Sequence, residues 1–344
     1  MQLYSTPAGR INLIKGETLA HAIPYEVLGL GCKMRPFPKG RGDTIIYRRW
    51  LPFGATAVDH NTMNRPVVSA AAHLLTEGVT PNPDTISPVD VQATMLQYGC
   101  VYAYSDKSAY LNEDDIPEEM KEQVGQRMGL VREMVRFGAM RAASNVFFAG
   151  GTSRAMVDRA ISLPLLRRVA RSLKRNFANK KTRILSPGPN FGTSAIEAGW
   201  LVFVSSDCES DVRDLPGFTP VADYANRSPI SEHEIGSVEE FRFILSASLV
   251  QYPNAGAAVG ATGMFSTGGA NVDVYPYIVV GEEAVFDIAL RGADSFNITH
   301  IPHSRVEKSD PLGQRGVVGA SFWSAVMVAN QGHMAVIEAG ATNI

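Results

Sequence analysis

The sequence is poor in cysteine and has no excess of charge of either sign. Its 344 residues hold 32 Lys and Arg against 34 Asp and Glu, which leaves a formal net charge of -2. A chain this close to neutral has no global positive field, which argues against a DNA-coating, histone-like role. The length excludes a disulfide miniprotein, and the few cysteines form no C-x-x-C pair, so we expect them to be reduced, small apolar residues. They are Cys32, Cys100 and Cys208.

No export signal or membrane span is evident in the sequence. Charged residues interrupt the first 20 positions at Arg10, Lys15 and Glu17, where a secretory signal needs an unbroken apolar stretch. Residues 243–272 and 317–337 carry no formal charge, but proline, glycine and polar residues interrupt both. We expect strands with polar loops in both stretches. A folded protein is expected because 45% of residues are hydrophobic and 19% charged. The sparse cysteines and the missing export signal favour the cytoplasm.

Motifs for known catalytic chemistry are missing too. The sequence holds no P-loop, G-x-S-x-G elbow, H-E-x-x-H helix or Rossmann fingerprint. His300 and His303 flank Pro302 without a third ligand at a recognisable spacing, so a packed or solvated pair is favoured over a metal site. An acidic cluster lacks the glycine and terminal glutamate of an EF-hand, which favours a solvated loop over a cation site; its members are Asp207, Glu209, Asp211 and Asp214. We therefore predict no catalytic, cofactor-binding or metal residues, and no enzyme.

The first third of the chain, to about Asp106, is rich in Gly, Pro and Thr and shows little helical periodicity. Residues 44–50 and 89–96 are typical of strands, and a proline-rich segment separates them. This pattern predicts a long two-stranded arm with an elaborate tip. Because isolated hairpins are marginal in water, the arm is expected to lie on something else.

A long helix is predicted from Pro117 onward. Asp115 can cap it, and Glu118 and Glu119 complement its dipole. If it continued to Phe148, it would be about 48 Å long at a rise of about 1.5 Å per residue. One apolar stripe at spacings of three and four gives its expected buried face: Met120, Val124, Met128, Val131, Val135 and Ala139.

A second helix is predicted after Pro164, with one apolar and one basic side, and is expected to continue into Lys180, Lys181 and Arg183. The basic side could follow a phosphate backbone, although a solvated face is the commoner meaning; its residues are Arg167, Arg168, Arg171, Lys174 and Arg175. Strands are predicted at 200–204, 241–245, 277–280 and 321–328. Partly segregated helices and strands without a βαβ rhythm predict the α+β class.

The arm is basic and the start of the long helix is acidic. We expect these segments to pair between subunits, because an arm folded back onto its own helix would no longer be extended. The basic residues are Lys39, Arg41, Arg48 and Arg49, and the acidic ones are Glu113, Asp114, Asp115, Glu118 and Glu119. Reversal of Arg48 and Arg49 to glutamate is expected to weaken this pairing between subunits without unfolding the subunit.

Four segments in order resemble a known family. They are PFPKGRG at 36–42, LTEGVTP at 75–81, DVYPY at 273–277 and DPLGQRG at 310–316. The chain resembles, over nearly its whole length, the major capsid proteins of tailed bacteriophages of the phage N4 kind, which have the Hong Kong 97 coat fold.

The resemblance implies a division of the chain. It gives an N-terminal arm at 1–31, an extended loop at 32–106, and a peripheral domain with a spine helix at 107–161. The axial domain follows at 162–291, a peripheral strand pair at 292–331 and a C-terminal strand of the axial domain at 332–344. The tip of the strand pair is expected to meet neighbouring capsomers through Asp310, Gln314 and Arg315.

The implied function is structural: pentamers and hexamers of the chain assemble into an icosahedral head around double-stranded DNA. Expected partners are further copies, a separate scaffolding protein because no helical leader precedes the arm, a portal, and an optional decoration or cement protein. Contact with packaged DNA is expected to be nonspecific, and no membrane is involved. The expected location is the virion, after assembly in the host cytoplasm. The alternative is the shell of a cellular nanocompartment with the same fold, and a soluble enzyme ranks third.

Overall fold

The computed structural model describes residues 26–50, 70–78, 80, 85–86, 88–112, 115–181, 198–224, 229–260, 263–291, 297–306 and 310–344. Its helices are α1 (Asp106–Leu111), α2 (Ile116–Arg141), α3 (Leu163–Arg175) and α4 (Glu209–Arg213), with short 3-10 turns between elements. Mixed helices and strands confirm the α+β class. Within the described residues, no helix is both long and apolar enough to cross a membrane.

A five-stranded sheet underlies the long helix. Its order is β1-β11-β13-β12, and β4 also pairs with β13. The strands are β1 (Cys32–Phe37), β4 (Leu96–Ser105), β11 (Val285–Leu290), β12 (Asn297–Ile301) and β13 (Arg315–Val328). Strand β13 is long enough to pair with two strands along one side: residues 317–321 pair with β12 and residues 324–328 pair with β11.

A seven-stranded sheet forms a second layer with α3. Its order is β5-β14-β10-β6-β9-β8-β7. The strands are β5 (Val146–Phe148), β6 (Trp200–Ser205), β7 (Thr219–Pro220), β8 (Glu234–Val238), β9 (Phe241–Ser246), β10 (Tyr275–Val280) and β14 (Met334–Ala339). The predicted strands at 200–204, 241–245 and 277–280 are thereby confirmed. The described parts of the uncharged stretches at 243–272 and 317–337 are strands and loops with one short 3-10 turn at Gln331–His333.

The predicted arm is an antiparallel hairpin of β2 (Thr44–Trp50) and β3 (Pro88–Thr94). Strand β3 ends before Met95, whose buried side chain marks the turn into β4. Residues 32–37 and 96–105, which the resemblance places in the extended loop, are strands of the five-stranded sheet. Strand β11 pairs in the five-stranded sheet and β5 in the seven-stranded sheet. The expected division places β11 within 162–291 and β5 within 107–161. The expected N-terminal arm up to residue 25 lies outside the described residues.

Helix α2 begins as predicted and ends earlier than the length estimate assumed. The Asp115 side chain accepts a hydrogen bond from the backbone N–H of Glu118 at 3.3 Å, which caps the start. The helix has 26 residues and is about 39 Å long. It stops at Arg141 because the following segment becomes β5, which pairs in parallel with β14.

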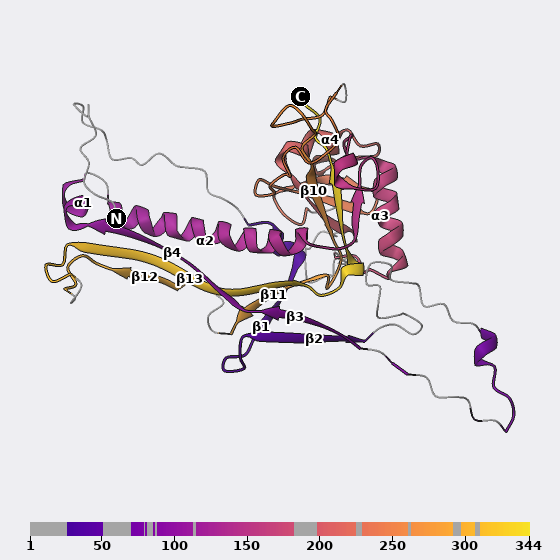
Figure 1. Cartoon of the computed structure of the whole chain (residues 1–344), viewed down its shortest axis with the longest axis horizontal. Coiled ribbons are helices and arrows are strands. Elements are labelled where there is room, and N and C mark those ends of the chain that lie inside the picture. The colour runs from indigo at the N-terminus through magenta and orange to yellow at the C-terminus, as the bar shows by residue number, and fades with distance from the viewer. Residues whose placement is uncertain are drawn as a thin grey trace, which may run out of the picture.

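The buried face of α2 changes sheets along its length. Met120 and Val124 pack on the five-stranded sheet, whereas Phe137 and Met140 pack on the seven-stranded sheet. The predicted stripe is therefore right in its first half and wrong for Val135 and Ala139, which are only half-buried. A single stripe fits one flat surface, and this helix spans two. Figure 1 shows α2 along β4 and β13, with the seven-stranded sheet standing at its C-terminal end.

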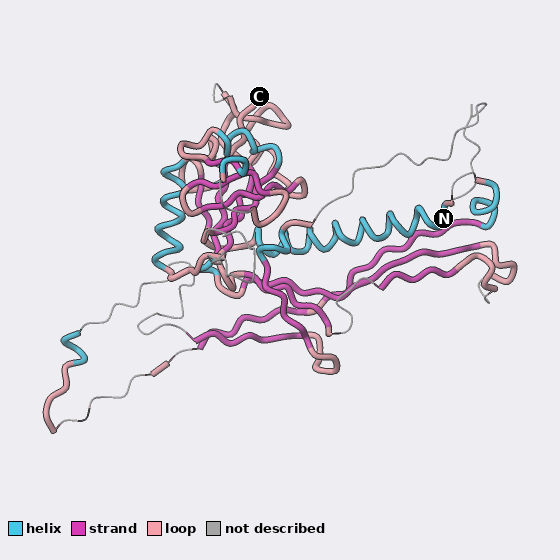
Figure 2. The backbone as a smooth tube through the Cα atoms, turned by 180° about the vertical axis from the view of Figure 1, so that it is seen from behind, coloured by secondary structure: helices cyan, strands magenta, loops and turns pink. Residues whose placement is uncertain are grey.

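Helix α3 has the predicted two-sided character. Leu165, Leu166, Val169 and Leu173 are buried against the seven-stranded sheet. The expected continuation through Lys180 and Lys181 is wrong, since Asn176 caps the helix and Phe177 adopts a positive φ of 54°; Arg183 lies outside the described residues. Figure 2 shows from behind that α3 forms one flank of this unit.

The cysteines behave as small apolar residues. All three are free, and Cys32 and Cys208 are buried in the two cores of the seven-stranded sheet. Burial raises the pKa of both thiols to about 12. Because the thiolate is the reactive form, N-ethylmaleimide is expected to modify only Cys100 in the folded chain and all three cysteines in denaturant. Mass spectrometry of tryptic peptides measures this, and equal labelling of Cys32 and Cys100 in the folded chain would contradict it.

Candidate subunit interfaces

The β2–β3 hairpin has one covered and one uncovered face. Its side chains alternate, so Ile45 and Tyr47 pack inward against the five-stranded sheet. On the other face Ile46 and Trp50 are 59% and 54% exposed. Arg48 lies between these two side chains on the same face, and nothing in the described part of the chain covers them. Aromatic residues such as Trp50 are enriched in protein interfaces, so this mixed polar and apolar face is a candidate contact surface.

Arg48 lies on the same outer face and pairs within its own hairpin. Its Nε and Nη2 donate to the two carboxylate oxygens of Asp90 at 2.8 and 2.9 Å. The register of the hairpin places these residues directly opposite each other. The hydrogen bond from Arg48 lowers the pKa of Asp90. Arg48 would therefore have to leave or share Asp90 in order to pair with a neighbouring subunit, as predicted from the sequence.

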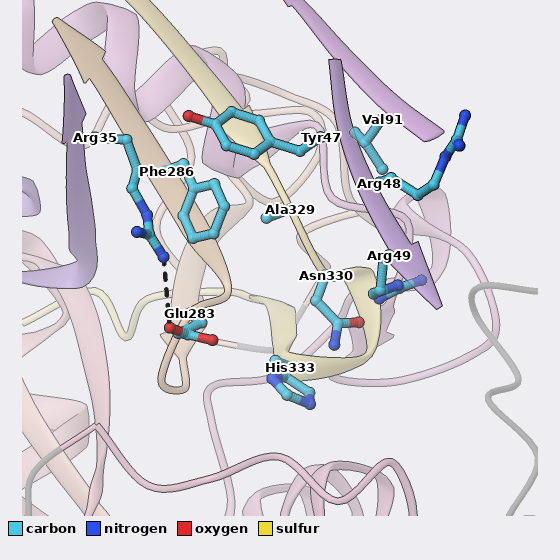
Figure 3. Close-up of a pocket in the computed structure, with 10 residues that line it drawn as sticks. All are labelled: Arg35, Tyr47, Arg48, Arg49, Val91, Glu283, Phe286, Ala329, Asn330 and His333. Carbon is cyan, nitrogen blue, oxygen red and sulfur yellow. Dashed lines mark ion pairs between the residues drawn. The ribbon is translucent and has the colours of Figure 1, made fainter. Parts of the chain in front are cut away.

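Arg49 points the other way, into a cavity of about 290 Å³ at the root of the hairpin (Figure 3). Arg35 and Glu283 form an ion pair at 3.8 Å on one side of this cavity, and Arg35 also lies over the Phe286 ring. Burial lowers the pKa of Arg49, which is half-buried. The ion pair thus joins β1 to the turn before β11, and Arg49 of the hairpin lines the same cavity.

His333 lines the same cavity, and its burial predicts that the stability of the protein depends on pH. Burial is the main cause that lowers the pKa of His333 from its usual 6.5, and the nearby Arg49 charge adds to it. The unfolded chain takes up a proton below pH 6.5 while the folded chain resists it, so this contribution to stability is lost as the pH falls below 6.5.

We therefore expect His333→Gln to lose less stability than the wild type between pH 7 and pH 5. Glutamine stays neutral across this range, so the variant lacks the proton uptake that favours the unfolded chain. Urea denaturation at a series of pH values measures the difference. Parallel pH profiles for the two proteins would show that His333 does not titrate differently on folding.

Lys39, Arg41 and Arg48 are the exposed members of the predicted basic set. Lys39 and Arg41 occupy the turn between β1 and β2, where Gly40 and Gly42 have positive φ values of 76° and 85° that glycine adopts without strain. No ion pair joins the side chain of Lys39 or Arg41 to another described residue, whereas Arg48 pairs with Asp90. Of the four basic residues that the sequence groups together, two are therefore both exposed and without an ion pair among the described residues.

The acidic start of α2 lies beside α1 at one end of the molecule, whereas the β2–β3 hairpin lies below its middle (Figure 1). Asp115 caps the helix, Glu118 pairs with Lys121 at 2.7 Å, and Glu119 accepts from the Gln123 side chain. The predicted members Glu113 and Asp114 lie outside the described residues. The basic turn and the acidic helix start are therefore not brought together within one chain.

The tip of the β12–β13 pair is fixed to α1. The backbone N–H of Asp106 donates to the Gln314 carbonyl at 2.9 Å, and Asp310 accepts from the Arg315 N–H at 2.7 Å. Leu312 is 77% exposed and Gln314 is exposed beside it. This tip presents an ordered edge that ends in an uncovered apolar side chain.

The rejected metal candidates have other contacts. Each histidine bonds a different tyrosine: His300 lies 2.9 Å from the Tyr104 hydroxyl and His303 lies 2.8 Å from the Tyr110 hydroxyl. In the acidic cluster, buried Asp211 accepts from the Thr342 N–H at 2.9 Å, and Glu209 pairs with Arg213. Across the described ranges no three potential ligands gather into a metal site.

A buried charge network at the junction of the two sheets is absent from the sequence prediction. The Arg136 guanidinium donates to Asp287 at 2.7 and 2.9 Å and to Glu26 at 2.7 Å. Glu133 accepts from the N–H groups of Val27 and Leu28, both at 2.9 Å. These contacts fasten the start of the described chain and β11 to α2. The sequence offers one signal for this network: Glu133 and Arg136 are three positions apart in the half of α2 where the predicted apolar stripe is wrong.

Comparisons with known proteins agree with this architecture. No protein-family profile matches the chain. The major capsid protein of Pseudomonas phage KPP21 is 20% identical over 269 residues, which cover 72% of this chain and 67% of that protein. The capsid of Ralstonia phage GP4 matches with a TM-score of 0.64 at 11% identity, covering 100% of this chain and 99% of that one. The capsid of cyanophage Pam1 matches with a TM-score of 0.59 at 14% identity over the whole of both chains.

The fold is therefore the α+β coat fold of phage capsid proteins, of the Hong Kong 97 type. The resemblance to phage major capsid proteins is confirmed, whereas nothing places the chain with phage N4 in particular.

Proposed function

We propose that the chain is the major capsid protein of a tailed phage, a structural protein and not an enzyme. The observation that carries this is the match of the fold to phage capsids over the entire chain. The uncovered outer face of the β2–β3 hairpin supports it, because a two-stranded hairpin with exposed Ile46 and Trp50 gains stability when a neighbour covers it. The nanocompartment alternative is not favoured, since the curated relative and the structural matches given above are phage capsids.

The proposed assembly consists of pentamers and hexamers that close into an icosahedral head around double-stranded DNA. Several modest contacts per copy, engaged together in a closed lattice, give an avidity that no single contact has. We assign the five-stranded sheet with α2 to the peripheral domain, the seven-stranded sheet with α3 to the axial domain, and the β2–β3 hairpin to the extended loop. The virion is the proposed location, after assembly in the host cytoplasm.

The proposed contacts between copies follow the exposed charges and edges. Lys39 and Arg41, with a contribution from Arg48 and Arg49, dock on the acidic start of α2 in an adjacent copy. Asp310, Gln314 and Arg315 at the tip of the β12–β13 pair meet neighbouring capsomers. A scaffolding protein, a portal and a decoration or cement protein are the proposed further partners, and packaged DNA is contacted without sequence preference.

Electron microscopy and sedimentation of the purified full-length chain test this proposal, first alone and then with a candidate scaffolding protein. Closed icosahedral shells or capsomer rings are the expected result. A stable monomer or dimer under both conditions would overturn the shell function.

A further inference from the structure

Helix α3 carries a concentrated positive charge on its outward side. Its 13 residues include five Arg and Lys and no acidic residue. The apolar side of the helix is buried on the seven-stranded sheet, so the five cations are held exposed on the opposite side. This is a local excess on a chain whose overall formal charge is -2. The excess is therefore a property of this surface and not of the composition.

Four of the five cations, all except Arg168, line a shallow groove of about 620 Å³ between α3 and the turn that joins β8 to β9. Two glutamates of that turn share the groove. Arg167 donates to Glu239 at 2.8 Å through Nε, while Lys174 and Lys180 lie 2.7 and 3.2 Å from the Glu240 carboxylate. Burial opposes the ionisation of Glu240, but the two ammonium groups outweigh it and lower its pKa.

Arg171 and Arg175 line the same groove and form no ion pair with any described residue. They are four positions apart on the helix, so their side chains lie one above the other on the same face. Arg168 is exposed on the same helix but does not line the groove, and its guanidinium lies 6.0 Å from the Phe147 ring. After the internal ion pairs are counted, the groove keeps an open row of two guanidinium groups, those of Arg171 and Arg175.

The occupant that fits this row is a chain of phosphates. Guanidinium groups bind phosphate oxygens in a bidentate manner and stay charged at all working pH values. The one apolar residue in the lining, Ala170, is itself buried, so the groove offers no pocket for the apolar or aromatic anchor that centres protein interfaces. A phosphate backbone needs no such pocket.

We infer that the α3 groove binds the sugar-phosphate backbone of duplex DNA, with Arg171 and Arg175 as its main contacts. The inference rests on the proposed function, which supplies the DNA, and it assigns a contact surface on the axial unit that the proposed function leaves open. Binding is independent of base sequence, because the contacts are to phosphates alone.

The test uses the purified full-length chain and a fluorescent DNA duplex of random sequence, with binding followed by anisotropy between 50 and 200 mM salt. Arg171→Gln/Arg175→Gln is expected to weaken binding about 10-fold or more at low salt. It should also reduce the slope of log K against log salt by roughly two, since each phosphate contact contributes about 0.9. Glu239→Gln/Glu240→Gln should tighten binding, because it leaves the groove with more positive charge.

The matched control is Arg159→Gln/Arg213→Gln, which removes two exposed arginines outside α3 and changes the net charge equally. It should bind DNA within about twofold of the wild type. Equal losses in the control and the α3 variant, or no loss in the α3 variant, would overturn the inference.

Electron microscopy of each variant separates this inference from the shell function. Shells formed by the α3 variant with weakened DNA binding support both. Loss of shells with unchanged DNA affinity would make α3 a contact between copies and overturn the DNA site. Absence of shells from the wild type would count against the shell function, while the DNA measurement would still stand.

Discussion

Replacement of Arg136 by methionine is expected to cost about 3–5 kcal/mol of unfolding free energy, the range for removing one partner of a buried ion pair. The Arg136 side chain is 6% exposed and that of Asp287 is 4% exposed. Methionine would leave Asp287 as an uncompensated buried carboxylate and would remove one of the two arginines that pair with Glu26. Urea denaturation, followed by circular dichroism, measures the loss.

Two further variants show that the loss comes from the unpaired charge. In Arg136→Met/Asp287→Leu both charges are gone, so much of the lost stability should return. Arg132→Met removes an arginine that also pairs with Glu26 but is 27% exposed, and its cost should be about 1 kcal/mol or less. A double variant no more stable than Arg136→Met would show that shape and not charge is the main contribution of Arg136.

The network explains why the sequence predicted the start of α2 better than its second half. Capping by Asp115 and the apolar spacing of Met120 and Val124 are local signals, and both are confirmed. Arg136 is buried because β11, about 150 residues later, brings Asp287 beside it. A periodicity argument has no access to such a partner, so a charged residue on a helix is assigned to the surface.

The strands show the same contrast between local sequence signals and distant tertiary partners. Residues 44–50 and 200–204 were predicted because β-branched and aromatic residues are dense there. Strand β1, with the sequence CKMRPF, has no such density, and it is a strand because β11 offers it a parallel edge. Tertiary pairing therefore decides the edge of the five-stranded sheet.

At the candidate interface, the sequence identified the charged segments but not the direction of each side chain. Arg48 and Arg49 are neighbours on a strand, so they must point to opposite faces. One reaches Asp90 and the other enters the root cavity beside His333. Reversal of both to glutamate would disturb the hairpin itself, so Lys39 and Arg41 give the cleaner test of contact between copies.

Lys39→Glu/Arg41→Glu is expected to raise the protein concentration needed for shell formation about 10-fold or more while the subunit stays folded. Both residues are exposed in the β1–β2 turn, so their replacement breaks no ion pair among the described residues. In the shell each reversed charge would face the acidic start of α2 of an adjacent copy, and the repulsion recurs at every copy. Light scattering against concentration measures assembly, and circular dichroism confirms folding.

A compensating charge reversal at the acidic start of α2 tests whether this segment is the partner of the basic turn. Glu118→Lys/Glu119→Lys alone should impair assembly in the same way, and the four-residue variant should recover shells because the attraction is restored with opposite sign. Lys39→Gln/Arg41→Gln, which removes the attraction without adding repulsion, should fall between the wild type and the reversal. High salt should narrow all of these differences, since exposed charges are screened beyond a Debye length of about 10 Å at 0.1 M. Recovery in the four-residue variant would identify the acidic helix start as the partner of the basic turn, whereas normal shells from Lys39→Glu/Arg41→Glu would exclude the turn as a contact.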